Sequence, residues 1–172
     1  DRKSNKIMQP AQVDRLFELA RKNDVQQMSA ILKKYPHAAN HATDAEGLTP
    51  MHAAATAGFV DMMRLLHDNG ASVTATDRDG WHPFHFACAE GHYGAVVWLL
   101  SHGADMQSPT NDGWLPIHVA AHTDQKEIAR YLDVQQADLR AKTHTGHEPI
   151  HLAVDTGATS FVEWLLERTD GE

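Results

Sequence analysis

Four side chains of the kinds that bind zinc lie within one short stretch, DGWHPFHFACAEGH, which begins at Asp79. They are His82, His85, Cys88 and His92, in the spacing H-x2-H-x2-C-x3-H. His and Cys are the usual zinc ligands, and clustered ligands are often separated by two or three residues. Considered alone, the stretch is compatible with a metal site. Whether they form a metal site or have a structural role depends on the secondary structure that positions them.

Other histidines also have spacings that could support chemistry. His118 and His122 are four residues apart, which on a helix places both on one face, but no third ligand accompanies them. A further cluster consists of His144, His147 and His151. His151 and Asp155 would share a helix face, yet no nucleophile is near them. Phosphate-binding loops and the motifs G-x-S-x-G and H-E-x-x-H are absent. We therefore predict no catalytic residues, no metal site and no cofactor.

Composition restricts the class of protein further. The 172 residues suit one domain or two small ones, and no apolar run approaches the roughly 18 residues of a membrane span. The start, DRKSNKIMQP, lacks the apolar stretch of a secretory leader, and its missing methionine leads us to expect a segment of a longer protein. A formal net charge of −8 disfavours nucleic acid as a partner. The single cysteine excludes an internal disulfide, which favours an intracellular location, cytoplasmic or nuclear.

A period of 33 residues organises most of the chain. The segments that begin at residues 44, 77, 110 and 143 read DAEGLTPMHAAATAGF, DRDGWHPFHFACAEGH, TNDGWLPIHVAAHTDQ and THTGHEPIHLAVDTGA. Each has a glycine, a proline and a histidine at the same places. These are Gly47, Gly80, Gly113 and Gly146, then Pro50, Pro83, Pro116 and Pro149, and finally His52, His85, His118 and His151. An unbroken period over four units indicates a solenoid of stacked repeats.

The pattern G-x-T-P-L-H-x-A-A resembles the ankyrin repeat, and the resemblance extends from about residue 12 to the end of the chain. It implies an all-α solenoid, in which each repeat has a hairpin-like turn, two antiparallel helices and a loop. The segment before residue 44 lacks the T-P-L-H signature and is polar, as expected of a divergent N-terminal capping repeat. We predict an N-terminal extension at residues 1–11, the capping repeat at 12–43, and ankyrin repeats at 44–76, 77–109, 110–142 and 143–172. The sequence leaves open whether a further C-terminal cap exists.

Helix-capping residues predict which repeat is least stable. The hydroxyl of Thr49 is expected to cap the helix that begins at Pro50. In the fourth repeat Leu115 replaces this threonine, while Asp124 and Gln136 replace the two helix-ending glycines. We therefore expect residues 122–142 to exchange amide hydrogens before residues 82–100.

The repeat also supplies an ordinary role for the histidine-rich stretch. His85 is the recurring histidine, which the resemblance implies makes structural hydrogen bonds near the turn. His92 occupies a position where the family commonly has histidine, and Cys88 aligns with small residues such as Ala55 and Ala121. Only His82, in place of the capping threonine, is unusual. This favours a structural role over a metal site.

The resemblance places binding on the turn tips and on a concave face of the inner helices, the first helix of each repeat. The predicted partner-binding residues are Glu46, Leu48, Arg78, Asp79, Trp81, Glu90, Asn111, Asp112, Trp114, His122, His147 and Asp155. Acidic and aromatic side chains predominate, which suits a protein or peptide partner with basic and apolar residues.

Three functional classes remain open. The preferred one is a monomeric, non-catalytic protein-interaction module that binds neither nucleic acid nor the membrane interior. The second is a regulatory or targeting domain of a larger enzyme or membrane protein. The third is a metal- or ligand-dependent activity that uses the histidine clusters.

Overall fold

The computed structural model describes residues 8–41 and 43–169, which contain eleven helices and no strand. The inner helices are α1 (Pro10–Lys22), α4 (Pro50–Thr56), α6 (Pro83–Ala89), α8 (Pro116–His122) and α10 (Pro149–Thr156). The outer helices are α2 (Val25–Lys34), α5 (Val60–Asp68), α7 (Tyr93–Ser101), α9 (Lys126–Val134) and α11 (Thr159–Thr169). A short helix, α3 (Ala38–His41), follows α2 and was not predicted from the repeat pattern.

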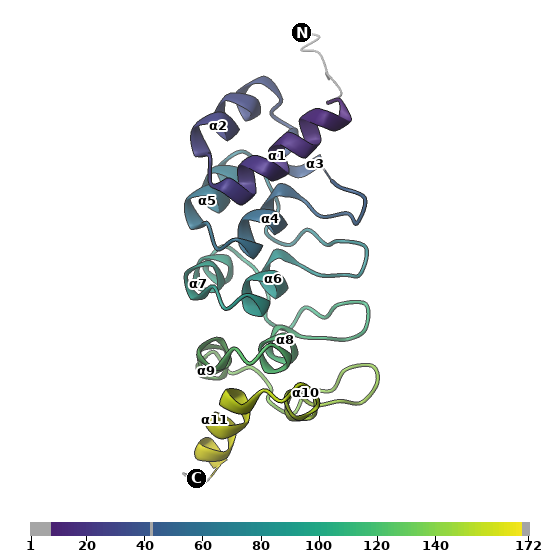
Figure 1. Cartoon of the computed structure of the whole chain (residues 1–172), viewed down its shortest axis with the longest axis vertical. Helices are drawn as coiled ribbons and strands as arrows, with labels where there is room; N and C mark the ends of the chain where they lie inside the picture. Colours follow the sequence, from purple (N-terminus) through teal and green to yellow (C-terminus); the bar gives the residue numbers. More distant parts are fainter. Residues whose placement is uncertain (1–7, 42, 170–172) are drawn as a thin grey trace.

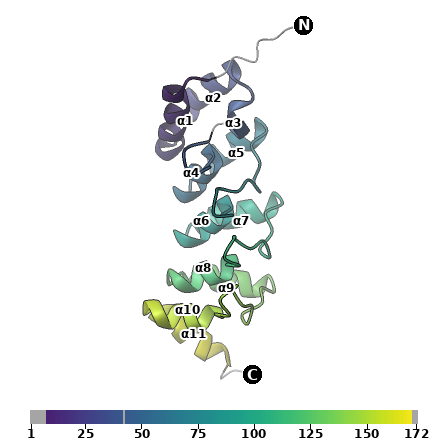
Figure 2. The same cartoon turned by 90° about the vertical axis from the view of Figure 1, so that its right-hand side faces the viewer.

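The helix pairs stack along one long axis, so the predicted all-α solenoid is confirmed (Figure 1). Each inner helix packs on the inner helices of adjacent pairs, and each outer helix packs on its outer neighbours. Hairpin-like turns project beyond the inner row, one above another (Figures 1 and 2). Helix α1 begins at Pro10, within the predicted N-terminal extension, of which residues 1–7 lie outside the described part.

Small residues on the inner helices allow the layers to approach closely. Ala54, Ala87 and Ala120 are completely buried at equivalent positions of α4, α6 and α8. Larger buried side chains come from both rows: Met51, Phe84 and Ile117 from the inner helices, and Met62, Met63, Leu66, Val96, Leu99, Ile128, Leu132 and Phe161 from the outer helices. The two rows together bury a continuous core along the stack.

The N-terminal cap of the inner helices differs from the prediction. The Thr49 side chain makes no capping hydrogen bond to the helix. Instead, Nδ1 of His52, three residues later, accepts a hydrogen bond from the Thr49 N–H at 3.0 Å. The Thr49 hydroxyl, which was expected to cap the helix, instead lies 2.9 Å from the same Nδ1 of His52. Leu115 therefore keeps the same bond, to His118 Nδ1 at 3.0 Å, and its replacement of threonine does not remove this cap.

The two glycine replacements in the fourth repeat do adopt left-handed backbone conformations, with φ of 56° at Asp124 and 69° at Gln136. Asp124 offsets part of this cost with its side chain. Its carboxylate accepts a hydrogen bond from the Phe161 N–H at 2.7 Å and a longer one from Ser160 N–H at 3.3 Å, at the N-terminus of α11. Early hydrogen exchange in residues 122–142 stays a prediction. The argument from Leu115 no longer supports it, the argument from Asp124 is weaker, and the argument from Gln136 is unchanged.

Residues of the following repeat explain why an aspartate fits at position 124 but would not fit at Gly58 or Gly91. A Cβ added to Gly58 would lie 2.6 Å from the His92 ring, and one added to Gly91 would overlap the Gln125 side chain. His92 and Gln125 reach back to carbonyl oxygens of the preceding repeat, at Thr56 and Ala89. The equivalent residue after Gly157 is Ala158, which is too short to do this. Between the last two repeats the side chain therefore comes from the earlier repeat. Asp124 accepts a hydrogen bond from the main chain of the later repeat, at Phe161.

Removing this cap should destabilise the C-terminal end. We expect Asp124→Ala to lower the free energy of unfolding by about 1–2 kcal/mol, as for other lost N-terminal caps. Asp124→Gly loses the same cap but relieves a left-handed strain of about 1 kcal/mol, so its loss should be smaller. Urea denaturation of the three proteins measures both differences. An alanine variant as stable as the original chain would show that the carboxylate contributes no stabilisation.

Candidate functional site

The histidine-rich stretch is occupied by structural hydrogen bonds. His82 Nδ1 lies 3.1 Å from the carbonyl oxygen of Thr74, and His92 Nε2 lies 2.9 Å from that of Thr56. Cys88 is completely buried, and this burial raises the pKa of its thiol, so the thiol stays protonated at neutral pH. Within residues 8–41 and 43–169, no three His, Cys, Asp or Glu side chains are placed to hold a metal ion together.

The recurring histidines form a hydrogen-bonded column through the repeats. His52, His85 and His118 are completely buried. In each, Nδ1 accepts from the main-chain N–H three residues earlier, at 3.0–3.1 Å. Because Nδ1 is an acceptor, the proton of the neutral ring is on Nε2, which donates to a main-chain carbonyl oxygen further along the chain. The acceptors are Trp81 at 3.0 Å, Trp114 at 3.2 Å and Ala141 at 2.9 Å.

Burial holds these three imidazoles neutral. Desolvation lowers the pKa of His52 and His118, and it lowers the pKa of His85 from 6.5 to about 4, with a further contribution from nearby His82. His151, at the end of the column, keeps the bond from the Glu148 N–H to Nδ1 at 3.0 Å but is exposed. Through these bonds His52 and His85 link adjacent repeats, so the role of the column is structural.

Main-chain hydrogen bonds also join the tips of the hairpin-like turns. The N–H of Arg78 donates to the Glu46 carbonyl at 2.9 Å, and that of Asn111 donates to the Asp79 carbonyl at 2.9 Å. The third bond of this series runs from the His144 N–H to the Asp112 carbonyl at 3.0 Å. The Asn111 amide adds a side-chain bond to the Arg78 carbonyl. The turn tips are therefore rigidly aligned along the solenoid.

The predicted partner-binding residues separate into two groups. The exposed ones are Glu46, Arg78, Asp79, Glu90, Asn111, Asp112, His122 and Asp155. The half-buried ones are Leu48, Trp81, Trp114 and His147. Glu90 and Asp155 lie at the C-terminal ends of α6 and α10, whereas the remaining residues apart from His122 belong to the turns.

The two tryptophans have different surroundings. The Trp81 ring lies 5.3 Å from Phe86 and 5.6 Å from His85, and so packs on its own inner helix. The Trp114 ring meets the exposed His122 edge-on at 5.1 Å. Trp81 therefore packs against a buried and a half-buried ring, whereas Trp114 packs against an exposed one.

Phe86 is a residue of this face that the sequence reasoning missed. Its ring lies between those of Trp81, at 5.3 Å, and His52, at 5.6 Å. A signal was present, because Phe86 occupies the position of Ala53 and Val119 in the adjacent repeats. A half-buried aromatic ring at this position extends the apolar part of the face.

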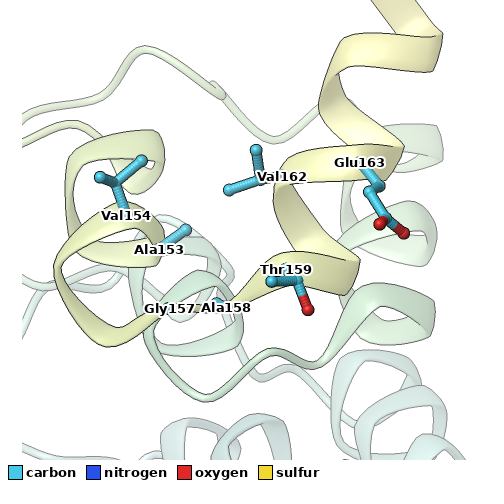
Figure 3. Close-up of a pocket in the computed structure, with 7 residues that line it drawn as sticks. All are labelled: Ala153, Val154, Gly157, Ala158, Thr159, Val162 and Glu163. Atoms are coloured by element: carbon cyan, nitrogen blue, oxygen red, sulfur yellow. The ribbon is translucent and has the colours of Figure 1, made fainter.

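A separate hollow lies at the C-terminal end of the solenoid, between α10 and α11 (Figure 3). Its lining is mainly apolar and includes Ala153, Val154 and Val162. Val154 is 63% exposed, whereas its equivalents Ala55 and Ala121 are completely buried under the following repeat. None of the residues that line the hollow is a predicted partner-binding residue.

Comparison with protein families identifies the class. A sequence model described as ankyrin repeats (3 copies) matches residues 16–110 and 96–172. The chain therefore belongs to the ankyrin-repeat family, whose members are typically non-catalytic and mediate protein–protein interactions. No curated protein sequence matches this chain. Over the described residues, no helix combines the length and apolar character needed to cross a bilayer.

Proposed function

We propose that this chain is a non-catalytic interaction module that binds a partner protein or peptide through its turn tips and inner-helix face. The observation that carries the proposal is the row of half-buried apolar side chains, Leu48, Trp81 and Trp114, beside exposed acidic residues. An aromatic side chain that is already partly fixed loses little conformational entropy on binding. Such a face suits a partner that has apolar residues next to Lys or Arg. In this proposal the chain itself is monomeric and intracellular.

The acidic side chains of this face are available to a partner. Within the described residues, Glu46, Asp79 and Asp112 take part in no salt bridge. The carboxylates of Asp44 and Asp77, in contrast, are used inside the turns, where they accept main-chain N–H bonds from Leu48 and Trp81. The turns thus hold one set of carboxylates internally and present another to solvent.

Truncation of the tryptophans tests the proposal. We expect Trp114→Ala to weaken partner binding at least about tenfold, because aromatic anchors often contribute 2 kcal/mol or more when truncated. Its melting temperature should change less than that of Trp81→Ala, since Trp81 packs on Phe86 and His85. Proteins retained from a native lysate by each variant are quantified by mass spectrometry, and the affinity of the recovered partner is then measured by titration.

A matched control is available on the opposite side of the molecule. Tyr93 is 50% exposed on outer helix α7 and contacts Tyr131 edge-on. Tyr93→Ala removes a more exposed aromatic ring from the outer row and should leave the affinity unchanged. If Trp114→Ala binds the partner as tightly as Tyr93→Ala does, the tryptophan row is not the binding site.

A further inference from the structure

We infer that the ligand of this face is an extended peptide segment with a basic side chain at every third position. Its basic residues lie along the row formed by Glu46, Asp79 and Asp112, hereafter the acidic row. The inference rests on the proposed function and adds the backbone conformation and sequence period of the ligand.

The hydrogen bonds of the turns determine the spacing of this row. Within one hairpin, the Asp77 N–H donates to the Trp81 carbonyl at 3.0 Å. Between hairpins, the Arg78 N–H donates to the Glu46 carbonyl at 2.9 Å, and the same pair of bonds recurs in the next repeat. Each repeat therefore adds one such turn, bonded to the turn before it. Since the inner helices that carry the turns pack on one another and packed helices lie about 8–10 Å apart, equivalent side chains recur about every 10 Å.

Two parallel rows run along the solenoid at this spacing. The acidic row consists of the residues immediately before the repeat glycines, and all of them are exposed. Leu48, Trp81 and Trp114 follow the same glycines and form an apolar row, each packed partly against the core. The two rows are two residues apart in every hairpin, so one ligand can contact both.

An extended ligand matches this period. A polyproline II segment has three residues per turn and rises about 3.1 Å per residue, so three residues span roughly 9 Å. Residues i, i+3 and i+6 of such a segment point the same way, toward successive carboxylates of the acidic row. A second residue of each triplet points toward the apolar row, and the third faces solvent. The predicted ligand is therefore a basic–apolar–variable triplet repeated three times.

Arg78 is the cationic residue nearest in sequence to the acidic row, and it affects how much the neighbouring carboxylate contributes to ligand binding. Arg78 precedes Asp79 and is exposed, so its charge opposes that of the ligand there. Asn111 occupies the equivalent place before Asp112 and is neutral. We expect Asp112 to contribute more to binding than Asp79.

Three capped nine-residue peptides test the inference on the full 172-residue chain. The first is (Arg-Leu-Ser)3, the second has the same composition with the three-residue period destroyed, and the third is (Arg-Leu-Pro)3. Affinities are obtained from tryptophan fluorescence and from competition with a labelled copy of the first peptide. We expect the first peptide to bind at least tenfold more tightly than the permuted one. The proline peptide should bind at least as tightly as the first, because proline favours the extended conformation and prevents a helix.

Matched variants separate the acidic row from general charge attraction. Asp112→Asn should weaken binding of the first peptide about threefold, within the range of exposed ion pairs. Asp61→Asn removes an exposed carboxylate from outer helix α5 and should have no effect. Equal losses in the two variants would mean that the ligand responds only to net charge and would overturn the inference.

The remaining outcomes are also decisive. Equal binding of the first and permuted peptides overturns the three-residue period. Binding of the first peptide but not of the proline peptide overturns the extended conformation in favour of a helix, which would need seven residues per repeat. If no peptide binds while Trp114→Ala still abolishes partner retention, the inference fails and the proposed function stands. If Trp114→Ala leaves partner retention intact, the proposed function itself fails.

Discussion

Lowering the pH from 6.5 to about 4 should remove about 3 kcal/mol of folding free energy through His85 alone. His85 is completely buried, with Nδ1 accepting the His82 N–H and Nε2 donating to the Trp114 carbonyl. A second proton on this ring would place an N–H against the N–H of His82. The neutral ring is therefore the form that the folded protein accommodates.

The sign follows from the lowered pKa. Between pH 6.5 and about 4 the unfolded chain binds a proton at His85 that the folded chain does not. The stabilisation is complete above pH 6.5 and is lost as the pH falls through this window. His52 and His118 act in the same direction, since desolvation also lowers their pKa. Nearby Asp44, Asp77 and Asp138 oppose this shift in those two histidines but do not outweigh the desolvation.

Urea denaturation at a series of pH values measures the effect. In His85→Gln the amide can accept and donate at similar positions but does not titrate, so we expect its free energy of unfolding to vary less across this pH window. His151→Gln changes the exposed histidine at the same repeat position, and should retain the pH dependence of the original chain. Identical pH profiles for the original chain and His85→Gln would show that the buried ring is not the acid-sensitive group.

Gly113→Ala should destabilise the protein by about 2–4 kcal/mol, whereas Gly146→Ala should cost only about 1 kcal/mol. Both glycines are left-handed, with φ of 78° and 83°, so the backbone strain of an alanine is the same in each. They differ in their neighbours. A Cβ on Gly113 would lie 2.8 Å from the His144 nitrogen and 2.5 Å from its ring, while one on Gly146 would have no atom within 4 Å.

The difference between the two variants thus isolates the contact between adjacent turns. The added methyl group would push away the His144 main chain and weaken its hydrogen bond to the Asp112 carbonyl. Chemical denaturation of both variants, compared with the original chain, gives the two free energies. Similar losses would indicate that backbone strain alone makes these glycines necessary.

Much of this fold was predictable because it depends on local requirements that recur every 33 residues. A proline at the first helical position and glycines with left-handed backbones define each helix pair, whatever lies in the adjacent layer. The period therefore predicted the helices and the solenoid. Helix α3 was missed because it lies in the closing segment of the divergent first repeat, where the period is weakest.

The candidate site was only partly predictable. The turn residues follow from the repeat, and exposure of Glu46, Asp79 and Asp112 agrees with that reasoning. The environment of the tryptophans does not, because Phe86 and His122 approach them from the inner helices and lie five and eight residues further along the chain. Side-chain packing of this kind depends on the angle between turn and helix, which the period does not contain.

By itself, the sequence determined that the chain is an ankyrin-repeat solenoid and that its histidines recur, and it contains no phosphate-binding loop, G-x-S-x-G or H-E-x-x-H motif. Only the tertiary structure decided what those side chains do across the layers. It replaced the expected Thr49 cap with His52 and joined His52 and His85 to carbonyl oxygens of the following repeat. It also made Asp124 the cap of α11. The physical reason is that a repeat period reports what one unit requires of its own backbone, whereas hydrogen bonds between units depend on which atoms the stacking brings within about 3 Å.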